Sequence, residues 1–176
     1  MYPYARFFKA ALSARRAPRL GILDTHVSQH ICWPWDIDPW MELNNGRTLT
    51  LYDLGRVGIS IRTGLWAMLQ RQKWGIVVAG ATVRYRRRIT AFKCFEMRTR
   101  CIGWDDRFLY MEQSMWRDGE CSSAVLIRGA ITSRKGMVPP AQALEAMGES
   151  PQSPPLPDWV WSWIDADATR TWPPEG

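Results

Sequence analysis

One run of residues limits the fold more than any other feature of this sequence: 46–72 contains no proline, and its apolar residues recur mostly at steps of three and four. That spacing predicts a single long helix. Gly55, Gly58 and Gly64 lie within the run, although each glycine costs about 1 kcal/mol relative to alanine in an exposed helix. We therefore expect the helix to pack closely against a flat partner, for which a β-sheet is the natural candidate.

Extended segments flank this helix on both sides. One precedes it at 24–35, and four follow it at 76–88, 92–104, 107–117 and 122–134. They are rich in Val, Ile, Tyr, Phe and Trp, with alternation along each segment and turn signals between them. One strand, a long helix and four antiparallel strands make an α+β pattern in which the helix lies on the concave side of one sheet.

The length of 176 residues allows one domain of ordinary size with terminal segments. We predict a basic N-terminal segment at 1–20, a folded body at 21–147 and a Pro/Trp-rich tail at 148–176. The first sixteen residues predict a short amphipathic helix that docks on the body. In the tail, Asp158 is expected to cap a short helix, which packs against protein because it carries several of the 11 tryptophans.

The net charge of +6 favours an anionic partner: a phosphorylated cofactor, nucleic acid or an acidic membrane surface. No RNA-recognition, helix-turn-helix or zinc-finger signature is present, so nucleic acid is not the expected partner. The four cysteines form no C-x-x-C pair, which indicates reduced thiols in a cytoplasmic protein, and neither His26 nor His30 has metal-ligand spacing. No apolar run approaches the ~20 residues that span a bilayer, so no transmembrane segment is expected.

Carboxylates, carboxamides and a helix start gather between residues 36 and 47. Asp36, Asp38 and Glu42 lie close together in the sequence, and unpaired carboxylates are costly to bury. We therefore expect at least one of them to have a functional role. The Asn-Asn-Gly at 44–46 can end an extended segment and open a helix, whose first N–H groups have no partner inside the helix. An acid beside free N–H donors is a workable site for acyl transfer.

This segment resembles the strand-to-helix joint of hotdog-fold thioesterases of the 4-hydroxybenzoyl-CoA type, and the resemblance covers about residues 24–147. The fixed positions of the family pattern Asp-x-Asp-x-x-x-His-x-Asn-Asn-x-x-Tyr correspond in this chain to Asp36, Asp38, Glu42, Asn44, Asn45 and Thr48. The resemblance implies a hotdog fold, hydrolysis of an acyl-CoA or similar thioester with no cofactor consumed, and a homodimer or dimer of dimers. Glu42 replaces the usual His and Thr48 the usual Tyr, which leaves open a non-catalytic acyl-binding or assembly module on the same fold.

The resemblance assigns catalytic roles to two acids. Asp38 matches the nucleophile or general base of one branch of the family. Its alternative role is to cap the helix or to pair with Arg47. Asp53 matches the catalytic acid of a related branch and would act from the partner subunit. Its alternative role is an ordinary intrahelical pair with Arg56, three positions on.

Asn44 and Asn45 would orient the acid or donate to the substrate carbonyl oxygen, unless they only form the turn and the N-cap. The N–H groups of Gly46 and Arg47 would form the oxyanion site. Through their motif positions, Glu42 and Thr48 join the same substrate-binding set.

Arg84, Arg86 and Arg88 share one face of the strand expected at 76–88, where they would hold the phosphates of coenzyme A. The alternative is a solvated sheet face or an oligomer contact. A third possibility for the whole chain rests on its charge and its first sixteen residues, which would bind a membrane surface or nucleic acid.

Overall fold

The computed structural model describes residues 2–174, and in it one strand, a central helical region and a run of antiparallel strands follow one another in the predicted order. In chain order the elements are α1 (Tyr4–Arg16), β1 (His26–Ile31), η1 (Pro34–Asp36), α2 (Asn45–Thr63), α3 (Leu65–Gln72), β2 (Gly75–Tyr85), β3 (Cys94–Trp104), β4 (Leu109–Arg117), β5 (Glu120–Ser133), β6 (Gly136–Val138), α4 (Pro140–Met147) and α5 (Asp158–Ala168).

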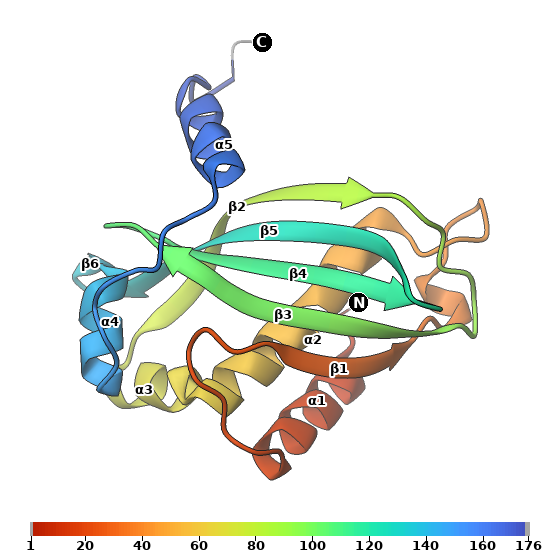
Figure 1. Ribbon diagram of the computed structural model, residues 1–176. Helices are drawn as coiled ribbons and strands as arrows, with labels where there is room; N and C mark the ends of the chain where they lie inside the picture. The colour runs from red at the N-terminus through yellow and green to blue at the C-terminus, as the bar shows by residue number, and fades with distance from the viewer. Residues whose placement is uncertain (1, 175–176) are drawn as a thin grey trace.

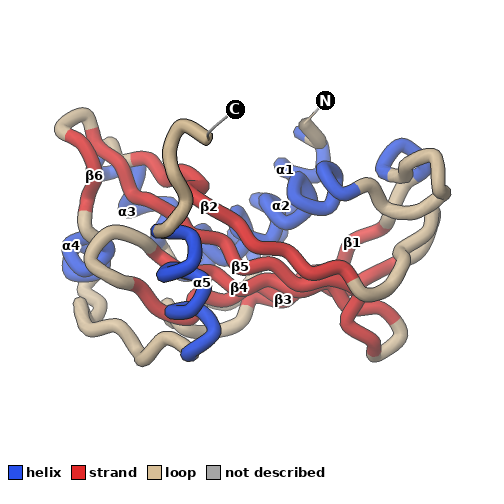
Figure 2. Tube along the Cα trace, turned by 90° about the horizontal axis from the view of Figure 1, so that it is seen from above, coloured by secondary structure: helices blue, strands red, loops and turns tan. Residues whose placement is uncertain are grey.

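One antiparallel sheet has the strand order β1-β3-β4-β5-β2, with the short β6 paired to β5. The sheet curls around α2, which lies along its concave side (Figures 1 and 2). β1 and β2 form the two edges. This is the α+β hotdog fold that the sequence predicts.

The main core lies between α2 and the sheet. Leu51, Tyr52 and Leu54 of the helix pack against apolar side chains of the strands, among them Phe95, Met97, Met111, Met115 and Val125. The glycines of α2 explain how closely the two layers approach. A Cβ at Gly55 would lie 2.4 Å from Thr99 Oγ1, and one at Gly58 would lie 2.2 Å from His26 Nε2. The expected close packing is therefore confirmed at both positions.

The prediction of one continuous helix over 46–72 is wrong at Gly64. This residue has a φ of 86°, in the left-handed region that favours glycine, and it ends α2 and precedes α3. The apolar residues Leu65, Met68 and Leu69 continue beyond the break, but they belong to a second cluster with Ile131 and others near α4.

The predicted strand at 76–88 is also too long, because β2 ends at Tyr85. The N–H groups of Arg86 and Arg87 both donate to the carbonyl of Ser122, at 2.8 and 3.0 Å, so the chain leaves the sheet ladder there. Alternation along a strand therefore does not determine where Arg86 and Arg88 point.

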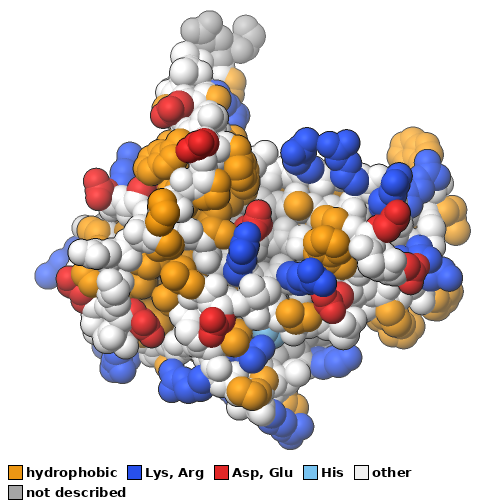
Figure 3. All heavy atoms as spheres, viewed as in Figure 1, with side chains coloured by type: hydrophobic (Ala, Val, Ile, Leu, Met, Phe, Trp, Pro, Cys, Tyr) orange, Lys and Arg blue, Asp and Glu red, His pale blue; other side chains and the backbone are white. Residues whose placement is uncertain are grey.

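The terminal segments pack on opposite sides of the body. α1 lies against α2, where Phe7 and Ala10 join the main core. α5 lies on the other face of the sheet from α2 (Figure 2), and hydrophobic side chains gather around it on the surface (Figure 3). Leu156 and Val160 form a third cluster there with Tyr110. Pro157 is the N-cap of α5, so Asp158 is its first helical residue and not its cap. Among residues 2–174, no helix combines the length and apolar character needed to cross a bilayer.

Candidate functional site at the start of the central helix

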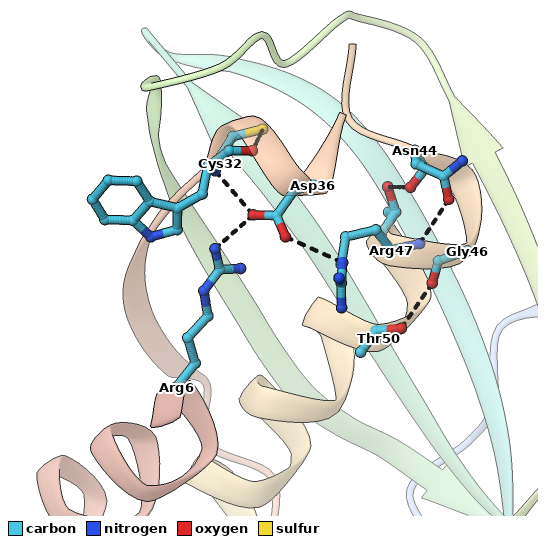
Figure 4. Close-up of polar contacts among 9 residues, drawn as sticks. Arg6, Cys32, Asp36, Asn44, Gly46, Arg47 and Thr50 are labelled. Atoms are coloured by element: carbon cyan, nitrogen blue, oxygen red, sulfur yellow. Dashed lines mark hydrogen bonds and ion pairs between the residues drawn. The ribbon is translucent and has the colours of Figure 1, made fainter. Parts of the chain in front are cut away.

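The start of α2 is fixed by Asn44 (Figure 4). Its backbone is extended, and its Oδ1 accepts a hydrogen bond from the Arg47 N–H at 3.1 Å, so Asn44 is the N-cap. Thr48 donates its hydroxyl back to the Asn44 carbonyl at 3.0 Å. One of the two predicted oxyanion donors, the Arg47 N–H, is thus used inside the cap. Within residues 2–174, the N–H groups of Asn45 and Gly46 make no hydrogen bond.

Asp36 is the buried acid of this segment, with a side chain only 1% exposed. Its carboxylate contacts Arg6 Nη2 at 2.6 Å and Arg47 Nε at 3.1 Å, and it accepts the Trp33 N–H at 2.9 Å. Figure 4 shows the two arginines reaching it from different helices, α1 and α2. Asp36 therefore joins α1 and the turn at 33–36 to the start of α2, and its two cations offset the cost of burying its charge.

Asp38 lies in the next turn and is half-buried. Its Oδ1 accepts the N–H groups of Trp40 at 2.9 Å and Glu42 at 3.4 Å, and its own N–H donates to the Glu42 carbonyl at 2.8 Å. The possible ion pair between Asp38 and Arg47 is not formed, since Arg47 contacts Asp36. The turn thus fixes one carboxylate oxygen of Asp38, while Oδ2 has no hydrogen-bond partner among residues 2–174.

A pocket of about 260 Å³ opens beside the helix start. Its lining brings together four of the predicted site residues: Glu42, Asn45, Thr48 and Arg86. Glu42 pairs with Arg88 at 2.9 Å, so the carboxylate at the usual His position has its own counter-ion. Arg84 is exposed on β2, and neither it nor Asp38 is part of the lining.

Asp53 belongs to a different polar group, deeper along α2. It pairs with Arg56, the alternative that the sequence offered, and Arg56 also donates to the Gln113 side chain at 2.6 Å. The buried Gln113 donates to Thr99 Oγ1 at 2.9 Å. Burial lowers the pKa of Arg56 to about 10. A rise of 1.5 Å per residue places Asp53 about 12 Å along the helix axis from Asn45, so one subunit does not bring them together.

Sequence reasoning missed Arg6, Gln113 and Tyr85. Arg6 precedes its partner Asp36 by thirty residues, and nothing in the local pattern connects the two. Gln113 occupies the inward parity of β4, between Met111 and Met115, and a lone polar residue at that parity is a usable signal. Tyr85 lines the pocket from the end of β2.

His26 and His30 line a separate groove of about 650 Å³ between α1 and β1. His26 Nδ1 lies 3.0 Å from Arg62 Nη1, and His30 Nε2 lies 2.8 Å from the Ser28 hydroxyl. Burial lowers the pKa of each imidazole to about 4, with Arg62 adding to the effect on His26. Within the described part of the chain, no three His, Cys, Asp or Glu side chains gather as metal ligands would.

The candidate site lies in the part of the chain that matches a model of a known protein family. The family model described as "Thioesterase-like superfamily" matches residues 32–164, which reach into α5. Protein THEM6 from Xenopus laevis is 31% identical over 157 residues, covering 87% of this chain and 74% of that protein.

Solved structures of other proteins share this architecture, among them the following two. The probable thioesterase YbaW from Escherichia coli superposes with a TM-score of 0.63 at 16% identity, covering 69% of this chain and 97% of that one. A DHNA-CoA thioesterase from Staphylococcus aureus gives a TM-score of 0.61 at 13% identity, covering 82% and 91%. At these identities the likeness concerns the fold.

Proposed function

Because the chain belongs to the thioesterase-like superfamily, we propose that it hydrolyses an acyl thioester, with an acyl-coenzyme A as the substrate class. The observation that carries this proposal is the start of α2, which follows the turn that holds Asp38. There the N–H groups of Asn45 and Gly46 have no hydrogen-bond partner within residues 2–174, and Asn45 lines the pocket. The DHNA-CoA thioesterase among the similar structures supports the choice of coenzyme A as the leaving group.

In the proposed mechanism Asp38 is the nucleophile or general base. The Trp40 and Glu42 N–H groups orient its Oδ1, and Oδ2 attacks the carbonyl carbon or takes a proton from the attacking water. The N–H groups of Asn45 and Gly46 stabilise the oxyanion that forms. The C–S bond then breaks, and the departing thiolate of coenzyme A takes up a proton. Where Asp38 is the nucleophile, this step leaves a mixed anhydride between Asp38 and the acyl group, and a water molecule then hydrolyses it to the free acid and restores the carboxylate. Where Asp38 is the general base, the water oxygen is already part of the acid, and the proton that Asp38 took goes to the thiolate. Either route consumes one water, the products are a free acid and a thiol, and no cofactor is consumed.

The basic residues at the end of β2 divide into two pairs. Arg87 and Arg88 have carboxylate partners, Glu120 and Glu42. Arg84 and Arg86 have no ion pair within residues 2–174, so we assign them to the phosphates of coenzyme A. We place the enzyme in the cytoplasm, consistent with four cysteines that form no disulfide.

The site is proposed to be completed in a homodimer. β2 is an edge strand with exposed apolar residues, including Val77 at 51% and Val78 at 53%, and a second copy of this strand would cover them. Asp53 would then approach the site from the partner subunit. A dimer of dimers would add a second interface to this one.

A second candidate function is a non-catalytic acyl-binding or assembly module. The ion pair between Glu42 and Arg88 favours it, because a paired carboxylate replaces the neutral imidazole that is usual in the family. The hydroxyl of Thr48 is also used inside the helix cap.

The test is release of free coenzyme A from a panel of aryl-CoA and C2–C18 acyl-CoA substrates. Asp38→Asn should lower kcat by about 100-fold or more, the range for losing a positioned base or nucleophile. Asp106→Asn removes an exposed carboxylate from a turn elsewhere and should leave turnover unchanged. Full activity in both Asp38→Asn and Asp53→Asn would remove both acids from the mechanism. Acyl-CoA binding without turnover would instead support the binding module.

Mixing the two inactive variants tests whether the acids act across the dimer. In a dimer of Asp38→Asn with Asp53→Asn, one of the two sites keeps both acids. Random exchange of subunits should therefore restore about a quarter of wild-type activity. No recovery would place both acids in the same subunit's site or in none.

A further inference from the structure

The outward face of α1 is apolar and largely exposed in the described part of the chain, where Tyr4 and Phe8 contact only the neighbouring rings of Tyr2 and Phe7. Tyr4, Phe8 and Leu12 are spaced by four residues, so they lie along one side of the helix, and they are 64%, 66% and 50% exposed. The opposite side is already used, since Phe7 and Ala10 pack on the main core. α1 therefore has two apolar sides, and only one of them is explained by the fold.

The charged side chains of α1 are all basic. α1 contains four basic residues and no acid, and Lys9, Arg15 and Arg16 are exposed beside the stripe. An apolar stripe flanked by cations is complementary to an anionic lipid surface, where the rings enter the interface and the cations meet the headgroups. A second copy of the same face would instead bring like charges together across a two-fold axis.

We propose that α1 binds the surface of an anionic lipid bilayer through Tyr4, Phe8 and Leu12, with Lys9, Arg15 and Arg16 contacting the headgroups. This goes beyond the proposed hydrolysis and does not depend on it. The helix lies on the bilayer and does not cross it.

The attachment of α1 to the body makes this surface part of a rigid unit. Arg6 bonds to Asp36 at 2.6 Å, and beyond the end of α1 Arg62 Nε donates to the Pro18 carbonyl at 2.9 Å. Near the helix start, Tyr2 and Trp35 line one shallow hollow, and Trp35 is largely exposed. Aromatic residues of this kind are enriched at membrane interfaces, so Trp35 extends the same contact. Docking would hold the body, and the start of α2 with it, in one orientation at the lipid.

The test is co-sedimentation of the full chain with phosphatidylcholine vesicles that contain or lack phosphatidylglycerol. We expect binding to the anionic vesicles that weakens as salt is raised, and little binding to the neutral ones. Phe8→Ser/Leu12→Ser should weaken binding about tenfold or more, since it removes two apolar anchors without changing the charge. Both side chains are exposed, so circular dichroism and the melting temperature should stay those of the wild type.

Two double charge reversals, one on α1 and one far from it, distinguish a contact between α1 and the lipid from general attraction of the basic protein to an anionic surface. Arg15→Glu/Arg16→Glu should abolish most of the binding. Arg134→Glu/Lys135→Glu makes the same change in net charge at the exposed turn before β6 and should retain binding. Equal loss in both pairs would overturn the proposal, as would absence of vesicle binding by the wild type. Self-association that Phe8→Ser/Leu12→Ser disrupts, without vesicle binding, would assign this face to a second copy.

Discussion

Two histidines beside α1 are held neutral by burial, and this makes stability depend on pH. The pKa of His26 and of His30 is lowered to about 4, whereas an unfolded histidine titrates near 6.5. Between these values the unfolded chain binds protons that the folded chain does not. The free energy of unfolding is therefore highest above pH 6.5, and the stabilisation from the two neutral imidazoles is lost as the pH falls from there through about 4.

We expect the free energy of unfolding to fall by about 2 kcal/mol per histidine between pH 7.5 and 5, measured by urea denaturation. The variant His26→Gln/His30→Gln should show a flatter dependence over the same range. An unchanged slope in that variant would assign the effect to other groups.

At the scale of elements, the distance between α2 and the sheet depends on glycine. Gly55→Ala would place its Cβ within 3 Å of Met97, Thr99 and Gln113, so the layers must separate. We expect a loss of about 1–3 kcal/mol in the free energy of unfolding, as for other overpacked cores. Gly46→Ala, on the same helix, meets only Asn44 Oδ1 at 3.4 Å. It should be neutral or stabilise by up to about 1 kcal/mol, and equal losses in the two variants would contradict the packing argument.

The elements also show how far local pattern extends. α2 and the long strands were predictable because a helical period of 3.6 and a strand period of 2 persist over many residues. The break at Gly64 was not, because Leu65 and Met68 continue the helical spacing into a different cluster. The end of β2 at Tyr85 depends on hydrogen bonds to Ser122, which no local pattern of residues encodes.

The candidate site was predictable to a similar extent. Its motif positions gather at the helix start as expected, and Glu42, Asn45 and Thr48 share one pocket. The ion pairs of Asp36 and Glu42 could not be predicted from the sequence, because their partners Arg6 and Arg88 come from segments distant in the chain.

For the whole molecule, the two sheet edges are expected to behave differently. At one edge, α1 lies beside β1, and the two elements line a groove between them. At the other edge, β2 exposes Val77 and Val78. Val78→Lys should convert the proposed dimer to a monomer, because a lysine on an edge strand opposes pairing with another chain. Val27→Lys puts the same charge on the β1 edge and should leave the dimer intact. Sedimentation velocity distinguishes these outcomes, and a wild-type monomer, or a dimer that survives Val78→Lys, would exclude β2 as the interface.

The buried carboxylate of Asp36 has a consequence for any attempt to shorten the chain. A version that starts after Arg16 would lose Arg6 and keep Arg47, so an enclosed negative charge would have one cation where it now has two. α1 thus supplies one of the two cations that neutralise the buried acid at the start of α2. Trimming it as a dispensable leader would disturb a helix start that follows it by some thirty residues in the chain.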